Sequence, residues 1–240
     1  MNILLGLYAK SELQPWILKT PLNSDCFIGL DVSHEDGRHT SGIVQVVGKD
    51  GKVLSSRNVS SSEAGEKISA NTLEEIIFEV IHQYRESYSS NLNHLTIHRD
   101  GKSFAEEIEA IQGILSKLSI SFDYVSVIKR NNRRMATITD NGQWETKMGT
   151  AYVKGNMAYL CATDPRDNVG MAVPLKIVQQ TQELTIQQIL SDIYHLSFMH
   201  IGALNKSRLP ITTHYADLCS TQYNRGYMPK DHNSKALYFV

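Results

Sequence analysis

Short apolar runs that end on polar residues recur through the first half of the chain. Residues 26–32 read CFIGLDV and residues 94–98 read HLTIH, and each run has the length of a buried strand. Residues 41–59, SGIVQVVGKDGKVLSSRNV, alternate on both sides of Asp50 and Gly51, which predicts a hairpin. A further run, FDYVSVIKR, occupies residues 122–130. The pattern predicts a sheet with several buried strands.

Three segments have apolar residues at helical spacing instead. The first begins at Asn71, with Glu74 as its capping partner, the second near Ser103, and the third at Thr185, with Gln188 three residues on. The predicted order is three antiparallel strands, then helix, strand, helix and strand, followed by short strands to about residue 178. This order predicts an α/β fold, a mixed β-sheet flanked by helices, and it matches the ribonuclease H-like pattern.

Composition narrows the class of protein. The chain has 240 residues with 24 Lys and Arg against 25 Asp and Glu, so the global charge does not indicate a nucleic-acid binder and any such function must come from local patches. Its three widely spaced cysteines form no CxxC pair, which argues against zinc and against a disulfide framework. There is no run of 18 apolar residues. A cytoplasmic protein without membrane contact is expected.

Four acidic residues stand where they could support chemistry. Asp31 and Asp100 end two apolar runs, Asp217 lies in HYADL, and Glu66 lies in the polar stretch 60–70, which is expected to be a loop. A strand that ends on Asp100 and Gly101 could simply enter a surface turn. Open α/β sheets, however, keep their active sites at the carboxyl ends of strands. Clustered carboxylates need a counter-charge, and Mg²⁺ or Mn²⁺ provides it through hard oxygen ligands.

Four motifs, FIGLDVSH, EAGEKI, LTIHRDG and RLPITTHYADL, occur in this order and resemble the PIWI domain of prokaryotic Argonaute proteins. The segments VSVIKRNNRRM, MGTAYV, LSFMHIGALNKSRLP and KALYFV are similar to that family too. The resemblance covers residues 3–240. It implies the ribonuclease H-like fold of the family, with residues 1–24 as the junction from the MID domain and residues 25–240 as the PIWI domain.

The resemblance also implies a catalytic tetrad, Asp31, Glu66, Asp100 and Asp217. Asp31 would bridge two Mg²⁺ or Mn²⁺ ions, Asp100 and Asp217 would each hold one, and Glu66 would complete the site from its loop. Glu63 in the same loop is the nearest competitor for that role. The implied reaction is hydrolysis of one target-strand phosphodiester, leaving a 3′-hydroxyl and a 5′-phosphate.

The same resemblance implies the partners. These are a short guide, expected to be DNA, and a complementary single-stranded target, in a system of guide-directed silencing and host defence. The N-terminal, PAZ and MID domains of an Argonaute are expected to belong to a longer parent chain. The C-terminal carboxylate of Val240 is a candidate metal ligand near the guide's 5′ end.

A basic group accompanies these motifs. The candidate nucleic-acid contacts are Lys129, Arg130, Arg133, Arg134, Lys206 and Arg208, with a solvated charged face as the alternative. His34, His98 and His214 are expected to be mainly structural. Two other functions stay open: a different ribonuclease H-like nuclease or transposase core, and a guide–target duplex-binding module in which cleavage is vestigial or lost.

Overall fold

The computed structural model describes residues 2–35, 38–59, 67–163, 171–201, 207–228 and 233–240, without the side chains of residues 2, 33–35, 38–44, 59 and 224. Its strands are β1 (Cys26–Glu35), β2 (Arg38–Gly48), β3 (Val53–Val59), β4 (His94–Asp100), β5 (Ser121–Ile128), β6 (Thr137–Ile138), β7 (Trp144–Glu145), β8 (Ala151–Lys154), β9 (Met157–Leu160), β10 (Leu175–Gln179) and β11 (Asn233–Ser234). The helices are α1 (Asn2–Lys10), α2 (Ala70–Tyr88), α3 (Ala105–Lys117), α4 (Ile186–Leu196) and α5 (Ile211–Asn224).

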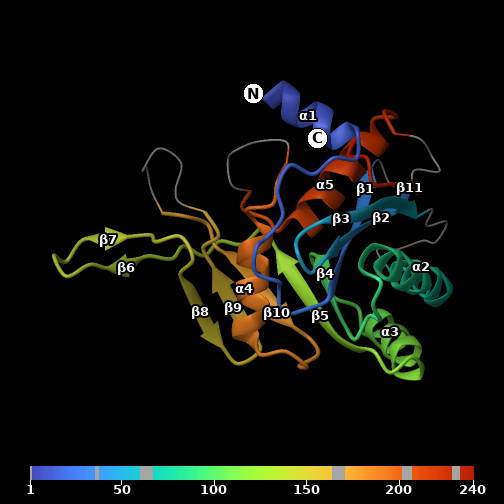
Figure 1. Ribbon diagram of the computed structural model, residues 1–240. Coiled ribbons are helices and arrows are strands. Elements are labelled where there is room, and N and C mark those ends of the chain that lie inside the picture. The colour runs from blue at the N-terminus through green and yellow to red at the C-terminus, as the bar shows by residue number, and fades with distance from the viewer. Residues whose placement is uncertain (1, 36–37, 60–66, 164–170, 202–206, 229–232) are drawn as a thin grey trace.

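Nine of these strands form one mixed sheet in the order β11-β3-β2-β1-β4-β5-β10-β9-β8 (Figure 1). Strands β1, β4 and β5 run parallel at its centre, and the pairs outside them are antiparallel. Strands β6 and β7 form a separate hairpin that projects away from the sheet (Figure 1). The parallel centre matters for function, because it brings the carboxyl ends of β1, β4 and β5 to one edge.

Helices cover both faces of the sheet, and the alternation of side chains along each strand explains this. Ile28 of β1 packs in the core cluster of α2 and α3, whereas its neighbour Phe27 packs in the cluster of α5. Beyond the centre, α4 packs on Val125 and Ile177. The chain therefore places α2 and α3 on one face, and α4 and α5 on the other.

The predicted order of elements is confirmed through β5, and two predicted helix starts are corrected. Helix α2 is capped by Ser69, which accepts a hydrogen bond from the backbone N–H of Thr72, so Asn71 lies inside the helix. Helix α3 begins at Ala105, two residues after Ser103, without a side-chain cap. The capping box of Thr185 and Gln188 at α4 is confirmed. Spacing located the helices, but several polar residues near each start compete for the cap.

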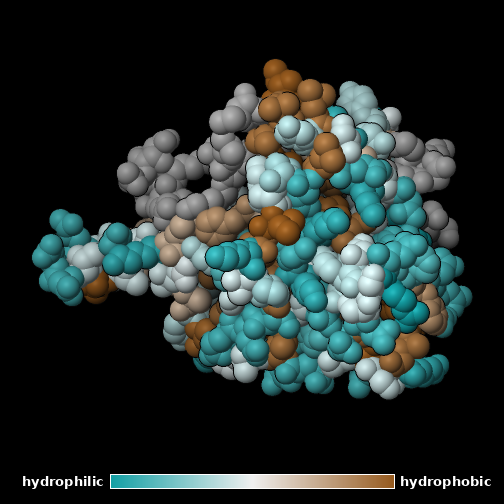
Figure 2. All heavy atoms as spheres, viewed as in Figure 1, coloured by the Kyte–Doolittle hydropathy of each residue, from teal (hydrophilic) through white to brown (hydrophobic). Residues whose placement is uncertain are grey.

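Helix α1 leaves apolar side chains on the surface. Ile3, Leu4 and Leu7 are 83%, 53% and 57% exposed, and brown residues gather over α1 at the top of Figure 2. Its inner side is anchored, since Ala9 packs in the same cluster as Phe27. No helix in the described part of the chain is long and apolar enough to cross a membrane.

Candidate metal centre

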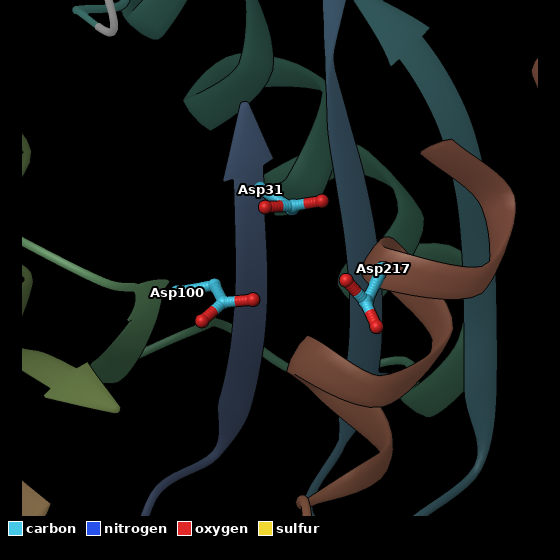
Figure 3. Close-up of side chains that lie close together, drawn as sticks. All are labelled: Asp31, Asp100 and Asp217. Atoms are coloured by element: carbon cyan, nitrogen blue, oxygen red, sulfur yellow. The ribbon is translucent and has the colours of Figure 1, made fainter. Parts of the chain in front are cut away.

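Three of the four predicted carboxylates come together in space. Asp31, Asp100 and Asp217 each offer one oxygen, and these oxygens all lie within 4.8 Å of one another. Figure 3 shows the three side chains turned toward a common space, from β1, from the end of β4 and from α5. They are separated by at least 69 positions in the sequence, so only the fold brings them together.

The register of the parallel strands brings the first two carboxylates together. Leu30 of β1 lies opposite Arg99 of β4, so the next residue on each strand, Asp31 and Asp100, reaches the same edge of the sheet. Gly101 then adopts φ of +89°, a left-handed conformation that suits glycine and turns the chain away from the edge.

A close approach of helix and strand places the third carboxylate. A Cβ atom on Gly29 would lie 2.2 Å from the carbonyl oxygen of Thr212, so only glycine allows α5 to pack this closely on β1. His98 supports the contact from β4, because its Nδ1 lies 2.8 Å from Oγ1 of Thr212. Asp217 lies further along the same helix, five residues after Thr212, and reaches the site from there.

The environment opposes ionisation of Asp31. The residue is 8% exposed. Burial first, and then the nearby charges of Asp100 and Asp217, raise the pKa of Asp31 to about 6. A cation among these oxygens would relieve that cost, and three carboxylates without thiol or imidazole ligands are the donor set that suits Mg²⁺ or Mn²⁺.

Lys129 provides one positive charge at this site. Its ammonium donates to Asp100 at 2.8 Å and to Asp217 at 2.6 Å. Burial lowers the pKa of Lys129, but the hydrogen bonds and charges of these two carboxylates outweigh burial and raise it. Lys129 was predicted only as a nucleic-acid contact. Lys129 directly follows β5, and the carboxyl ends of the parallel strands β4 and β5 lie side by side. This position is the feature of the sequence that could have placed Lys129 beside Asp100.

The other predicted basic residues lie around this point. Arg208 donates from its guanidinium to the backbone carbonyl of Lys129 at 2.7 Å, and Arg130, Arg133 and Arg134 are exposed on the segment that follows. Lys206 lies outside the described residues. The structure leaves their role in binding nucleic acid as a prediction.

Two further predicted site residues remain, Glu66 and Val240. Glu66 lies outside the described residues, and the chain is described again from Lys67 onward. The main-chain oxygen of Val240 accepts a hydrogen bond from the ammonium of Lys10 in α1, at 2.9 Å. The roles of Glu66 and Val240 both stay predictions.

Sequence reasoning missed a buried group beneath the site. Glu107 of α3 accepts hydrogen bonds from the hydroxyl of Tyr124 and from the backbone N–H of Ile68, and it lies 3.6 Å from the guanidinium of Arg99. An acidic residue in the first turn of a helix normally interacts with the positive end of the helix dipole. The sequence therefore gave no sign that Glu107 is buried. Glu107 fixes the chain at Ile68, two residues after Glu66.

The family model described as "Piwi: Piwi domain" matches residues 1–228. Among curated proteins, "Protein argonaute" of Aquifex aeolicus is 23% identical across 100% of this chain, and "Protein argonaute" of Thermus thermophilus is 26% identical across 90% of it. The alignments cover 33% and 31% of those two proteins. The chain therefore spans about a third of the length of the curated relatives it matches.

Solved structures give the same likeness. One match is the structure of Clostridium butyricum Argonaute bound to a guide DNA (5′ deoxycytidine) and a 19-mer target DNA. The alignment covers 100% of this chain and 32% of the Argonaute chain, with a TM-score of 0.89 and 33% identity. The structure of Aquifex aeolicus Argonaute matches with a TM-score of 0.75 and 21% identity, which supports the fold alone. The predicted ribonuclease H-like fold is confirmed.

Proposed function

The chain belongs to the Piwi domain family, and on this premise we propose that it is the catalytic domain of a guide-directed endonuclease. It would hydrolyse one phosphodiester of a target strand and leave a 3′-hydroxyl and a 5′-phosphate. The observation that carries the proposal is the convergence of Asp31, Asp100 and Asp217 within 4.8 Å. A surface turn would not explain why three separate elements direct carboxylates to one point.

The three carboxylates are a donor set that suits divalent ions. Two ions would be held here, both by Asp31 and one each by Asp100 and Asp217, and Glu66 would complete the set. When bound, Mg²⁺ or Mn²⁺ would supply a water of lowered pKa and stabilise the charge that develops on the phosphate. The protein's own contribution is rigid placement, because β1, β4 and α5 fix the three carboxylates before any ligand arrives.

The substrate class follows from the family and from the charges near the site. The Clostridium butyricum Argonaute of similar structure is described with a guide DNA and a target DNA, and we propose a short DNA guide and a complementary target for this chain. The six basic residues named above would contact their phosphates. Of these, Lys129 contacts the carboxylates directly, and Arg208 contacts the backbone carbonyl of Lys129. The parent protein would supply the N-terminal, PAZ and MID domains, and the Val240 carboxylate would help to bind the guide's 5′ end.

A duplex-binding module without cleavage is the second candidate. The observation that favours it is Lys129, whose ammonium satisfies two of the three carboxylates without any divalent ion. The two candidates agree on nucleic-acid binding and differ only in the consequence of losing a carboxylate.

Target cleavage by the guide-loaded parent protein separates them. Asp31→Asn and Asp100→Asn should each lower the cleavage rate by roughly 1,000-fold or more, since several kcal/mol of charge stabilisation are lost. Asp140→Asn, which removes an exposed carboxylate from the turn between β6 and β7, is the matched control and should leave the rate unchanged. Cleavage that survives both site substitutions would contradict the nuclease proposal and favour the binding module.

A further inference from the structure

A pocket of about 380 Å³ lies on the sheet away from the carboxylates. Its lining includes Arg133, Arg134 and Met135, which lead into β6, and Tyr152, Lys154 and Tyr159 of β8 and β9. The volume falls within the range of about 300–1,000 Å³ that is typical of small-molecule sites. The pocket is therefore large enough for part of a nucleic-acid chain.

The register of the strands shows why these side chains share a surface. Tyr159 lies opposite Tyr152 on one side and opposite Lys176 on the other, so the three side chains form one row across β8, β9 and β10. The residues that alternate with them, such as Ala158 and Ile177, are buried under α4 on the opposite face. The row stays accessible, and Tyr152 is 57% exposed.

The chemistry of the lining selects the ligand. Arg133, Arg134 and Lys154 provide three positive charges, and within the described chain no acidic residue lines the pocket. Phosphate groups complement such a surface. The rings of Tyr152 and Tyr159 add flat aromatic faces, on which unpaired bases stack. A ligand that consists of phosphate groups alone would not use these rings. Paired bases already stack within their duplex, so the lining matches a single strand best.

The pocket is connected to the candidate metal centre by a short basic segment. Lys129 contacts the carboxylates, and Arg134 lines the pocket only five residues later. Five residues span at most about 18 Å when fully extended, which limits the distance between the two Cα atoms. The carboxylates lie on the α5 face and the tyrosines on the opposite face, so the segment 129–134 leads from one to the other over the carboxyl edge of β5.

We propose that this pocket binds unpaired nucleotides of a strand that continues from the duplex at the carboxylates. The bases stack on Tyr152 and Tyr159, while Arg133 and Arg134 contact the neighbouring phosphates. The inference rests on the proposed function, because it takes its ligand from the same class. It adds a second contact region that holds the strand outside the paired segment.

Binding of a labelled single-stranded thymidine oligonucleotide to the 240-residue chain tests the inference, with a chelator present so that cleavage plays no part. Tyr152→Ala should weaken binding roughly 5- to 150-fold, the range of a lost base–aromatic contact, and Tyr152→Phe should restore most of it. Tyr227→Ala is the matched control, because Tyr227 is 76% exposed and does not line the pocket. A strand of equal length and charge without bases should bind these three tyrosine variants alike.

Salt dependence provides the second readout. Arg134→Gln should reduce the slope of log affinity against log salt by about 1, whereas Tyr152→Ala should leave the slope unchanged. A photocrosslink from 5-iodouracil in the strand should map to Tyr152 or Tyr159. The inference is overturned if Tyr152→Ala binds as tightly as Tyr227→Ala, if the crosslink maps elsewhere, or if the unmodified chain does not bind. If the unmodified, guide-loaded parent protein cleaves no target while this binding is intact, the result counts against the nuclease proposal alone.

Discussion

Asp123, near the start of β5, and Asp100, at the end of β4, lie at opposite edges of the central parallel strands. At the first edge, the Asp123 carboxylate lies within hydrogen-bond distance of His94 and accepts from the side chain of Gln179 and from the backbone N–H groups of Glu183 and Leu184. Burial raises the pKa of Asp123, but these contacts outweigh burial and lower it. At the other edge, the pKa of Asp31 is raised to about 6.

The edge that contains Asp123 also has a serine, a histidine and an aspartate in contact, an arrangement that resembles a catalytic triad. Oγ of Ser24 lies 2.9 Å from Nδ1 of His94, and Nε2 of His94 lies 3.2 Å from Asp123. Ser24, however, is 1% exposed, and its hydroxyl donates to the backbone carbonyl of Cys26. This group holds the amino ends of β1, β4 and β5 together and has no access to a substrate.

The difference shows how to separate a structural carboxylate from a functional one. Asp123 is fully buried and balanced by donors of the protein itself, so nothing further is needed. Asp31, Asp100 and Asp217 repel one another, and the ammonium that contacts two of them belongs to the flexible side chain of Lys129. Unbalanced negative charge in a partly open site is typical of a centre that binds a cation.

Removing the charge of Asp123 should have the largest effect on stability. Asp123→Asn turns an amide group toward several buried donors, and we expect the free energy of unfolding to fall by about 3 kcal/mol. Urea denaturation would measure this, with Asp140→Asn as the exposed control. If Asp123→Asn lowers the free energy of unfolding no more than the control does, Asp123 is not a structural carboxylate of the kind described.

The corresponding substitution at the other edge, Asp31→Asn, should raise the free energy of unfolding instead of lowering it. Because the pKa of Asp31 is raised in the fold, its contribution to stability is full below about pH 4 and is lost as the pH rises through 6. Asp31→Asn should therefore be more stable than the unmodified chain at pH 8, by about 2 kcal/mol without divalent ions, and equal to it near pH 4.

Denaturation curves between pH 4 and pH 8 would test whether Asp31→Asn is the more stable chain at high pH. Saturating Mn²⁺ should raise the stability of the unmodified chain and have little effect on Asp31→Asn, since the ion binds the folded carboxylates. A destabilised Asp31→Asn at pH 8 would mean that Asp31 is balanced within the protein, as Asp123 is.

Lys129 gives the smallest but most specific test. Its ammonium competes with a divalent ion for the oxygens of Asp100 and Asp217, so Lys129→Met should bind Mn²⁺ about tenfold more tightly. Calorimetric titration would measure the affinity. Lys147→Met, at an exposed lysine just after β7, is the control, and Asp217→Ala is a variant that should bind weakly. Unchanged or weaker binding by Lys129→Met would show that the lysine and the ion do not compete.

Much of this protein was determined by local sequence. The apolar runs at residues 26–32 and 94–98, the hairpin around Asp50 and Gly51 and the capping box at Thr185 predicted their elements, because a strand or helix follows from the spacing of a few neighbouring residues. Asp31, Asp100 and Asp217 could be named in advance because the first two end apolar runs and all three lie in motifs of a known family.

Tertiary structure alone decided which charges balance one another. The sequence shows Asp31, Asp100 and Asp123 as acidic residues in apolar runs without naming the partners of any of them, and it shows Lys129 only as part of a basic run. The parallel pairing of β4 and β5, with α5 packed beside them, sets Lys129 between Asp100 and Asp217. The antiparallel pairing of β10 with β5 brings Gln179 and Leu184 to Asp123. The physical reason is that a carboxylate's pKa and partners depend on atoms within a few ångströms of it, and these atoms come from segments far apart in the chain.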